Sequence, residues 1–166
     1  MQRDIISELQ AWKDSPNRKP LMLKGARQVG KTWALKEFGR TSYENVAYLS
    51  LEELAPGIPS EYVQLFERTH DVARLVRNIG MALGTDIVPG RTLIILDEIQ
   101  DCPAAIGSLK YFAEEAPEQH VACAGSLLGV ALARDGGSFP VGKVTFREMA
   151  PLSFSEFLRA TGGSGL

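Results

Sequence analysis

Residues 25–32 read Gly25-Ala26-Arg27-Gln28-Val29-Gly30-Lys31-Thr32, which is the pattern G-x-x-x-x-G-K-T of a phosphate-binding loop. The apolar run Leu21-Met22-Leu23 precedes this stretch, and the helix-like segment 33–38 follows it. A buried strand, a loop with glycines and a helix, in that order, form the context in which the pattern is a working site. The stretch therefore predicts an α/β fold that holds the phosphates of a nucleotide.

The residue types in the loop each suit this chemistry. Gly25 and Gly30 let the backbone turn tightly, so that consecutive N–H groups between them point toward an anion. The helix that starts at the loop adds its free N–H groups and the positive end of its dipole. We expect Lys31 to bind the β- and γ-phosphates of the nucleotide and Thr32 to offer its hydroxyl to Mg²⁺. Trp33 either packs behind the loop or stacks on the adenine.

A second motif, Leu93-Ile94-Ile95-Leu96-Asp97-Glu98, ends an apolar run with two carboxylates. The run does not alternate with polar residues, so it predicts a parallel strand buried on both faces. Ligands gather at the carboxyl ends of such strands. We expect Asp97 to hold Mg²⁺ through a bound water and to accept a hydrogen bond from Thr32. Glu98 would polarise the attacking water as a general base, which a kinase does not need, so the pair favours hydrolysis.

Two further polar residues follow predicted strands. Gln100 either orients water and pairs with the catalytic edge, or is a surface amide. Ser126 comes just after the strand predicted at 121–124, which lies beside the first strand in a five-stranded ATPase core. Its hydroxyl would then sense the γ-phosphate as a catalytic residue, and it suits a helix N-cap equally well.

The transition state of phosphoryl transfer also requires a cation. The candidates in this chain are Arg134, Lys143 and Arg147, and another subunit is an alternative source. For each of the three taken alone, an ordinary surface charge is the favoured interpretation. Arg27 is expected to point out of the loop, toward a partner, the adenine or solvent.

Strands and helices alternate along the chain, which predicts a mostly parallel sheet with helices on both faces. The helix after the phosphate loop is expected to end near Gly39, a plausible C-cap. Strands are predicted at 20–24, 46–51, 92–96, 121–124 and 141–146, and helices at 3–13, 33–39, 60–68, 71–83, 103–115, 127–133 and 154–160.

The composition of the 166 residues suits one domain with a sizeable core, because 45% of them are hydrophobic. The net charge of −2 and the pI near 5.7 do not indicate nucleic-acid binding. No signal peptide or 18-residue apolar run is present, and Cys102 and Cys123 lack metal spacing, so we expect a reduced, cytoplasmic protein without a membrane span. The isolated His70 and His120 carry no motif, and residues 161–166 read as a linker or truncation point.

Four stretches together resemble one prokaryotic family of AAA-type ATPases in the AAA+ superfamily, in which the ATPase domain precedes a larger C-terminal domain of unknown function. The resemblance spans about residues 3–160. It rests on residues 25–32, Leu96-Asp97-Glu98-Ile99-Gln100, Ala124-Gly125-Ser126 and Pro151-Leu152-Ser153-Phe154-Ser155-Glu156-Phe157-Leu158.

The resemblance implies a three-layer P-loop NTPase core whose sheet has the strand order 5-1-4-3-2. It implies MgATP as ligand, the roles already given to the two motifs, and Ser126 as a sensor. Many members carry Gly-Arg where this chain has Gly142-Lys143, and lysine cannot make the bidentate phosphate contact of arginine. We therefore expect an ATPase domain at 1–160 that belongs to a longer protein.

Two functions are compatible with these motifs. The first is an ATPase that couples hydrolysis to a conformational change in its C-terminal domain or another protein. The motifs do not specify whether such an ATPase assembles into an oligomer. The alternative is a nucleotide-controlled switch with little turnover of its own, because the missing cation can come from another subunit. A kinase is disfavoured because no arginine-bearing lid is evident, and a DNA-directed motor has no support in the net charge.

Overall fold

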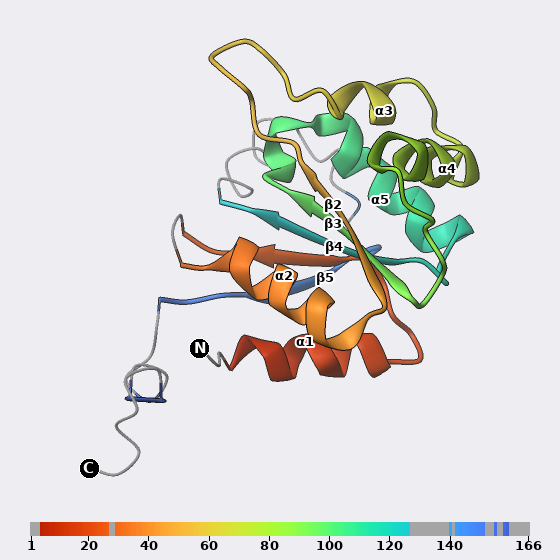
Figure 1. Cartoon of the computed structure of the whole chain (residues 1–166). Helices are drawn as coiled ribbons and strands as arrows, with labels where there is room; N and C mark the ends of the chain where they lie inside the picture. The colour runs from red at the N-terminus through yellow and green to blue at the C-terminus, as the bar shows by residue number, and fades with distance from the viewer. Residues whose placement is uncertain are drawn as a thin grey trace.

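The computed structural model describes residues 4–26, 29–126, 140, 142–151, 155 and 158–159, and a five-stranded parallel sheet forms its centre. The sheet order is β2-β3-β4-β1-β5 (Figure 1), which confirms the predicted order 5-1-4-3-2. Every neighbouring pair of strands runs parallel, as expected for a chain that alternates strands and helices. The strands are β1 (Leu21–Lys24), β2 (Asn45–Ser50), β3 (Thr92–Asp97), β4 (His120–Gly125) and β5 (Thr145–Glu148).

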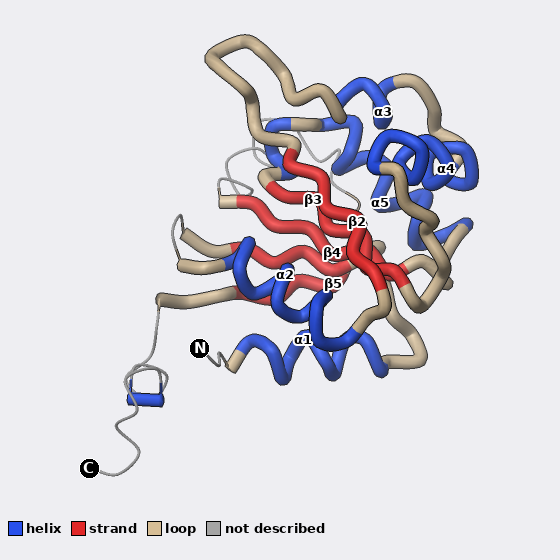
Figure 2. The backbone as a smooth tube through the Cα atoms, viewed as in Figure 1, coloured by secondary structure: helices blue, strands red, loops and turns tan. Residues whose placement is uncertain are grey.

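Helices cover both faces of this sheet and complete the three layers (Figure 2). The helices α1 (Ile5–Asp14) and α2 (Lys31–Ser42) lie on one face. The opposite face carries α3 (Val63–Glu67), α4 (Val72–Leu83) and α5 (Pro103–Glu115). A short 3-10 helix, η1 (Ile99–Asp101), follows β3 directly.

Each face has its own hydrophobic core, because successive residues of a strand point to opposite sides. Leu93 and Ile95 of β3 pack with α1 and α2, whereas Ile94 and Leu96 pack with the three helices of the other face. This double burial explains why the strand sequence shows no alternation between apolar and polar residues. The largest fully buried side chains are divided between the two cores: Leu9, Leu35 and Phe38 on the first face, and Phe66, Leu75, Ile79 and Phe112 on the second.

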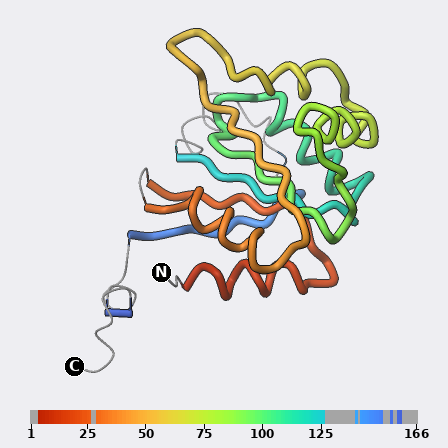
Figure 3. The backbone as a smooth tube through the Cα atoms, in the orientation of Figure 1, coloured from red at the N-terminus to blue at the C-terminus, as the bar shows by residue number. Residues whose placement is uncertain are grey.

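Because the strands are parallel, their carboxyl ends meet at one edge of the sheet. The carboxyl ends of β1, β3 and β4 lie toward the left of Figure 3. In register, Lys24 of β1 pairs with Gly125 of β4, and Ser50 of β2 pairs with Asp97 of β3. The fold therefore brings the phosphate loop, the two carboxylates and Ser126 to the same edge.

Three predicted boundaries were wrong. The helix α2 does not end at Gly39 but continues to Ser42, and Gly39 is a buried residue of the helix that packs against Val46 of β2. A Cβ at Gly39 would lie 2.5 Å from Cγ2 of Val46. The helix predicted at 60–68 is limited to 63–67, because the hydroxyl of Ser60 donates to the Ser50 carbonyl at 2.7 Å and holds a turn there.

The third wrong boundary is the start of the last strand. It was predicted at 141–146, and the structure shows β5 at 145–148. A turn occupies the earlier residues, since the N–H of Lys143 donates to the Pro140 carbonyl at 3.0 Å and Gly142 has φ of 81°. The helices predicted at 127–133 and 154–160 fall wholly or mostly outside the described residues.

Candidate nucleotide-binding site

The phosphate loop leaves β1 at a point of very close backbone packing. The N–H of Met149 donates to the Lys24 carbonyl at 2.9 Å, and a Cβ at Gly25 would lie only 2.5 Å from the Met149 carbonyl oxygen. Gly30 precedes α2 with φ of 94° and ψ of 24°, a left-handed conformation that glycine adopts without strain. Gly25 and Gly30, the two glycines of the pattern G-x-x-x-x-G-K-T, are thus both required by the geometry of the backbone.

The other loop residues divide between core and ligand side. Val29 is buried in the core beneath α2, so only its backbone is suited to contact a phosphate. Lys31 is 6% exposed, and its ammonium donates to the carbonyls of Gly25 at 2.7 Å and Ala26 at 2.8 Å. The charge of Lys31 is therefore held over the loop. Arg27 and Gln28 lie outside the described residues.

The two motifs meet at Thr32 and Asp97. The Thr32 hydroxyl donates to Oδ2 of Asp97 at 2.7 Å, which is the hydrogen bond predicted from the sequence. Asp97 is only 4% exposed, and its Oδ1 accepts from the N–H of Glu98 at 3.0 Å. These contacts place a hydroxyl and a carboxylate, both of them oxygen ligands that Mg²⁺ prefers, next to Lys31.

Sequence reasoning missed Tyr48, which also binds Asp97. The phenol of Tyr48 in β2 donates to Oδ2 of Asp97 at 2.6 Å. Burial of the ring and this hydrogen bond raise the pKa of Tyr48, so the phenol stays protonated and continues to donate. Tyr48 belongs to no sequence motif. The sequence could indicate only that the hydroxyl of a half-buried tyrosine needs a hydrogen-bond partner, without indicating which one.

Glu98 has an unusual backbone conformation. With φ of 53° and ψ of 48° it is the non-glycine residue with positive φ among those described. Such a conformation is uncommon outside glycine, and it concentrates at functional sites. The amide of Gln100 donates to Oε2 of Glu98 at 2.7 Å. Of the two interpretations of Gln100, pairing with the catalytic edge is therefore the one that the structure shows.

Two buried oxygens at this edge lack a hydrogen-bond partner among the described residues: Oγ of Ser126 and Oε1 of Gln100. Buried polar atoms are nearly always partnered, by protein or by a bound molecule. Their presence beside the phosphate loop fits a site that takes a polar ligand. The N-cap interpretation of Ser126 concerns a helix outside the described residues.

The model of the family described as "AAA domain" matches residues 17–158, which is most of the chain and includes every motif discussed above. The chain belongs to the AAA domain family. The expectation of an AAA-type P-loop ATPase domain is thus confirmed at the level of family.

Among solved structures, this AAA domain is similar to DnaA from Aquifex aeolicus bound to AMPPCP, with 14% sequence identity and a TM-score of 0.50. The match covers 96% of this chain and 48% of the DnaA chain, so the AAA domain spans about half the length of that structure. The likeness supports the fold. No curated protein matches the chain.

The candidate cations have different positions in the AAA domain. Lys143 precedes β5 at the amino edge of the sheet, opposite the phosphate loop, and pairs with Glu114 at 3.4 Å. It therefore cannot serve a nucleotide held by its own chain, which corrects one of the predicted alternatives. Arg147 lies in β5, in register with Leu23, and donates to the Phe146 carbonyl at 2.8 Å. Arg134 lies outside the described residues.

Trp33 follows the loop on α2 and packs, partly buried, against the core formed with α1. This packing favours the first interpretation of Trp33, and a contact with adenine stays a prediction.

Within the described part of the AAA domain, no three His, Cys, Asp or Glu side chains cluster as metal ligands, and no helix is long and apolar enough to cross a membrane.

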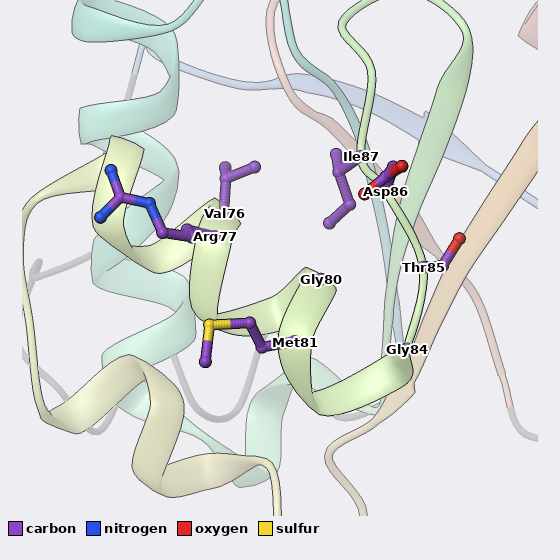
Figure 4. Close-up of a pocket in the computed structure, with 8 residues that line it drawn as sticks. All are labelled: Val76, Arg77, Gly80, Met81, Gly84, Thr85, Asp86 and Ile87. Carbon is purple, nitrogen blue, oxygen red and sulfur yellow. The ribbon is translucent and has the colours of Figure 1, made fainter.

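A hollow of about 380 Å³ lies away from the site, at the carboxyl end of α4 (Figure 4). Its side chains come from α4 and the loop after it, and in the figure Arg77 and Asp86 project from opposite sides of the hollow. None of the predicted site residues is among those that line it: Val76, Arg77, Gly80, Met81, Gly84, Thr85, Asp86 and Ile87.

Proposed function

We propose that this AAA domain binds MgATP at the carboxyl edge of its sheet and hydrolyses it to ADP and phosphate. The observation that supports this most directly is the 2.7 Å hydrogen bond between Thr32 and Asp97. It joins a phosphate-loop hydroxyl to the carboxylate that ends β3, as a P-loop NTPase requires. The family match makes nucleotide binding the expected role of such an edge.

In the proposed complex, the backbone N–H groups of residues 25–31 and the start of α2 hold the phosphates. Lys31 already sits over the loop on two carbonyl acceptors. Phosphate oxygens can replace those neutral acceptors and form stronger, charge-assisted hydrogen bonds. The loop thus needs little rearrangement of Lys31 to accept its ligand.

The donor set also fits Mg²⁺. Thr32 and Asp97 supply hard oxygen atoms, and the phosphates of the nucleotide supply the rest, which agrees with the usual way that Mg²⁺ is bound in ATPases. When bound, the metal would neutralise charge on the phosphate oxygens. Thr32 would ligate it directly and Asp97 would act through a water molecule.

Glu98 is the proposed general base. Its carboxylate takes a proton from water while the water oxygen bonds to the γ-phosphorus and the bond to the β–γ bridging oxygen breaks. The amide of Gln100 donates to one carboxylate oxygen of Glu98 at 2.7 Å and thereby orients the base. Ser126, with its buried hydroxyl free of a described partner, is the proposed sensor of the γ-phosphate.

The contact between Gln100 and Glu98 also supports the alternative function, a switch with little turnover. A base that is held by an amide is less available to water. A second subunit that supplies a cation, for example through Lys143 or Arg134, would then complete the site. Single-turnover hydrolysis that rises with protein concentration is expected in that case, and hydrolysis independent of concentration would argue against it.

We propose further that the energy drives a conformational change in the C-terminal domain of a longer protein or in a separate partner. The match to about half of a solved AAA+ chain is compatible with additional domains.

Cys102 and Cys123 are free and buried, which suits a reducing compartment, and we propose the cytoplasm as the site of action.

The test of hydrolysis is Glu98→Gln. We expect ATP binding to persist and turnover to fall about 100-fold or more, because a general base contributes 10²–10⁴-fold. Glu118→Gln removes an exposed acid just before β4, at the opposite edge of the sheet, and serves as the control with normal turnover. Equal turnover in wild type and Glu98→Gln would remove the base assignment.

A further inference from the structure

We infer that Tyr48 is a positioning residue for Asp97, and that its hydroxyl sets how much Mg²⁺ the domain needs to bind a nucleotide. The inference deepens the proposed function and rests on it, because it adds a residue to the same site. It starts from the 2.6 Å hydrogen bond between the phenol and Oδ2 of Asp97.

The carboxylate of Asp97 accepts three hydrogen bonds. Oδ2 accepts from Thr32 at 2.7 Å and from Tyr48 at 2.6 Å, and Oδ1 accepts from the N–H of Glu98 at 3.0 Å. Thr32 and Glu98 belong to the two nucleotide motifs, and their surroundings change when the ligand binds. Tyr48 comes from β2, outside both motifs, so it can hold Asp97 whether or not a nucleotide is present.

The sheet register explains why a tyrosine reaches this carboxylate. Ser50 of β2 pairs with Asp97, and Tyr48 pairs with Ile95. Tyr48 is thus one two-residue step behind Asp97 on the neighbouring strand, and on the same face. Such a step is about 6.6 Å along a parallel strand, a distance that a tyrosine side chain spans and a serine or threonine does not.

The ring of Tyr48 is itself held in place by α2. Nζ of Lys36 lies 4.0 Å from the centroid of the ring, a favourable cation–π contact. Lys36 is four residues after Thr32 and therefore on the same side of the helix. The helix that provides the metal-binding hydroxyl thus also fixes the phenol that supports the metal-binding carboxylate.

The ring is not sealed inside the protein. Lys36 and Tyr48 both border a hollow of about 430 Å³ between α2 and β2. Removal of the hydroxyl therefore leaves the packing of the ring intact, and Tyr48→Phe should fold. The variant would lose the donor on Asp97 and the contact between the phenol and the Ser50 side chain.

The consequence for Mg²⁺ follows from its strict geometry. The ion requires nearly ideal octahedral coordination, so a carboxylate that holds its water must be well oriented. Removing a hydrogen-bond partner of a metal-holding group commonly lowers metal affinity 10- to 100-fold. Asp97 keeps two other donors in Tyr48→Phe, so we expect the low end, a rise of about 10-fold in the Mg²⁺ needed for half-saturation.

The test uses the β,γ-methylene analogue of ATP at fixed concentration, while Mg²⁺ is titrated from a chelator-buffered zero. Binding is followed by titration calorimetry well below the unfolding temperature, so that a lower Tm does not imitate the effect. Tyr48→Phe should need about 10-fold more Mg²⁺ and bind the analogue normally in the presence of chelator.

Tyr43→Phe is the matched control. Its phenol also makes a 2.6 Å hydrogen bond, but to Nδ1 of His120 at the other edge of the sheet. Its Mg²⁺ requirement should equal that of wild type. Lys36→Met should shift the requirement in the same direction as Tyr48→Phe but only two- to threefold, an order-of-magnitude expectation for an exposed cation–π contact. In an Asp97→Asn background, Tyr48→Phe should add no further shift.

The outcomes separate the inference from the function. If wild type binds the analogue in an Mg²⁺-dependent way and Tyr48→Phe needs the same amount of Mg²⁺ or less, the positioning role is overturned and the proposed function stands. If wild type does not bind the analogue at any Mg²⁺ concentration, the proposed function itself fails.

Discussion

The two edges of the sheet use polar side chains in different ways. At the amino edge, an aromatic cluster of Trp12, Phe38, Tyr43 and His120 bonds within itself and to the nearby backbone. Tyr43 bonds His120 at 2.6 Å, and the indole of Trp12 donates to the Lys19 carbonyl at 2.7 Å. The rings also meet edge to face, with 5.9 Å between the centroids of Trp12 and His120.

The carboxyl edge carries unpartnered buried oxygens and left-handed backbone conformations. Oγ of Ser126 and Oε1 of Gln100 are buried without a partner among the described residues, and Gly30 and Glu98 have left-handed backbones. An unpartnered buried group and a left-handed residue other than glycine, such as Glu98, each cost on the order of 1–3 kcal/mol.

Near the amino edge, Nε of Arg18 and Oε1 of Gln119 also lack a partner among the described residues, so unpartnered atoms occur at both edges. The two edges differ instead in that the amino edge carries the buried aromatic cluster, whereas the carboxyl edge carries the two nucleotide motifs and the left-handed residue Glu98.

The largest expected effect is on the aromatic cluster. Trp12→Ala should lower the free energy of unfolding by about 3–5 kcal/mol, because it removes a buried ring and its hydrogen bond. The stabilisation produced by nucleotide should not change. Denaturant unfolding with and without nucleotide measures both quantities, and a loss of nucleotide response would show that the two edges are coupled.

Gly30→Ala should change the nucleotide response, which Trp12→Ala should leave unchanged. It forces a Cβ into the left-handed conformation, at a cost of about 1–2 kcal/mol in unfolding free energy, and it should also weaken the nucleotide response. Gly57→Ala is the matched control, since Gly57 has φ of 79° and open space around it. It should lose similar stability and keep the full response. Equal responses in the two variants would contradict the role of the loop.

The amino edge should also give the protein a pH dependence. Burial lowers the pKa of His120 to about 4, whereas the unfolded chain takes up the same proton near 6.5. The unfolded chain therefore binds a proton at His120 between pH 6.5 and 4 that the folded protein does not bind. The free energy of unfolding is unaffected by His120 above pH 6.5, and it falls by about 1–2 kcal/mol, after allowance for solvent screening, as the pH is lowered toward 4.

His120→Gln should remove this part of the pH dependence. The nearby charges of Lys13 and Arg18 act in the same direction as burial, so both should be left unchanged in the variant. The difference in unfolding free energy between wild type and His120→Gln, measured from pH 7.5 to 4, gives the result. A constant difference across this range would contradict the assignment.

The smallest expected effect is that of Tyr43→Phe. Loss of its hydrogen bond to His120 should lower the free energy of unfolding by about 1 kcal/mol, the usual value for such a bond. Thermal unfolding measures it, and a variant as stable as wild type would show that water replaces the phenol at the amino edge.

The sequence predicted what depends on local patterns and on general rules of parallel sheets. The apolar run that ends in Asp97 and Glu98 predicted a central strand whose carboxyl end lies at the ligand edge of the sheet. The predicted hydrogen bond between Thr32 and Asp97 is present there. Strand order followed from the resemblance to a family, because residue patterns alone do not specify which strands are neighbours.

Other features depend on contacts between distant segments, which no local pattern reports. Gly39 looked like the end of a helix, but it is the point where α2 packs against Val46. Tyr48 looked like an ordinary strand residue, and only the pairing of β2 with β3 brings its phenol to Asp97. Lys143 was a candidate cation for the site, but it precedes β5 and therefore lies at the amino edge of the sheet, opposite the phosphate loop.

The most direct test of the central claim is the effect of Mg²⁺ and the β,γ-methylene analogue of ATP on unfolding of wild type and Lys31→Ala. At 100 times the dissociation constant, wild type should gain about 2.7 kcal/mol of stability. Lys31→Ala should gain almost nothing at the same concentration, because the ammonium that lies over the loop is gone. Identical unfolding of wild type with and without the analogue would contradict the claim that the carboxyl edge holds a nucleotide.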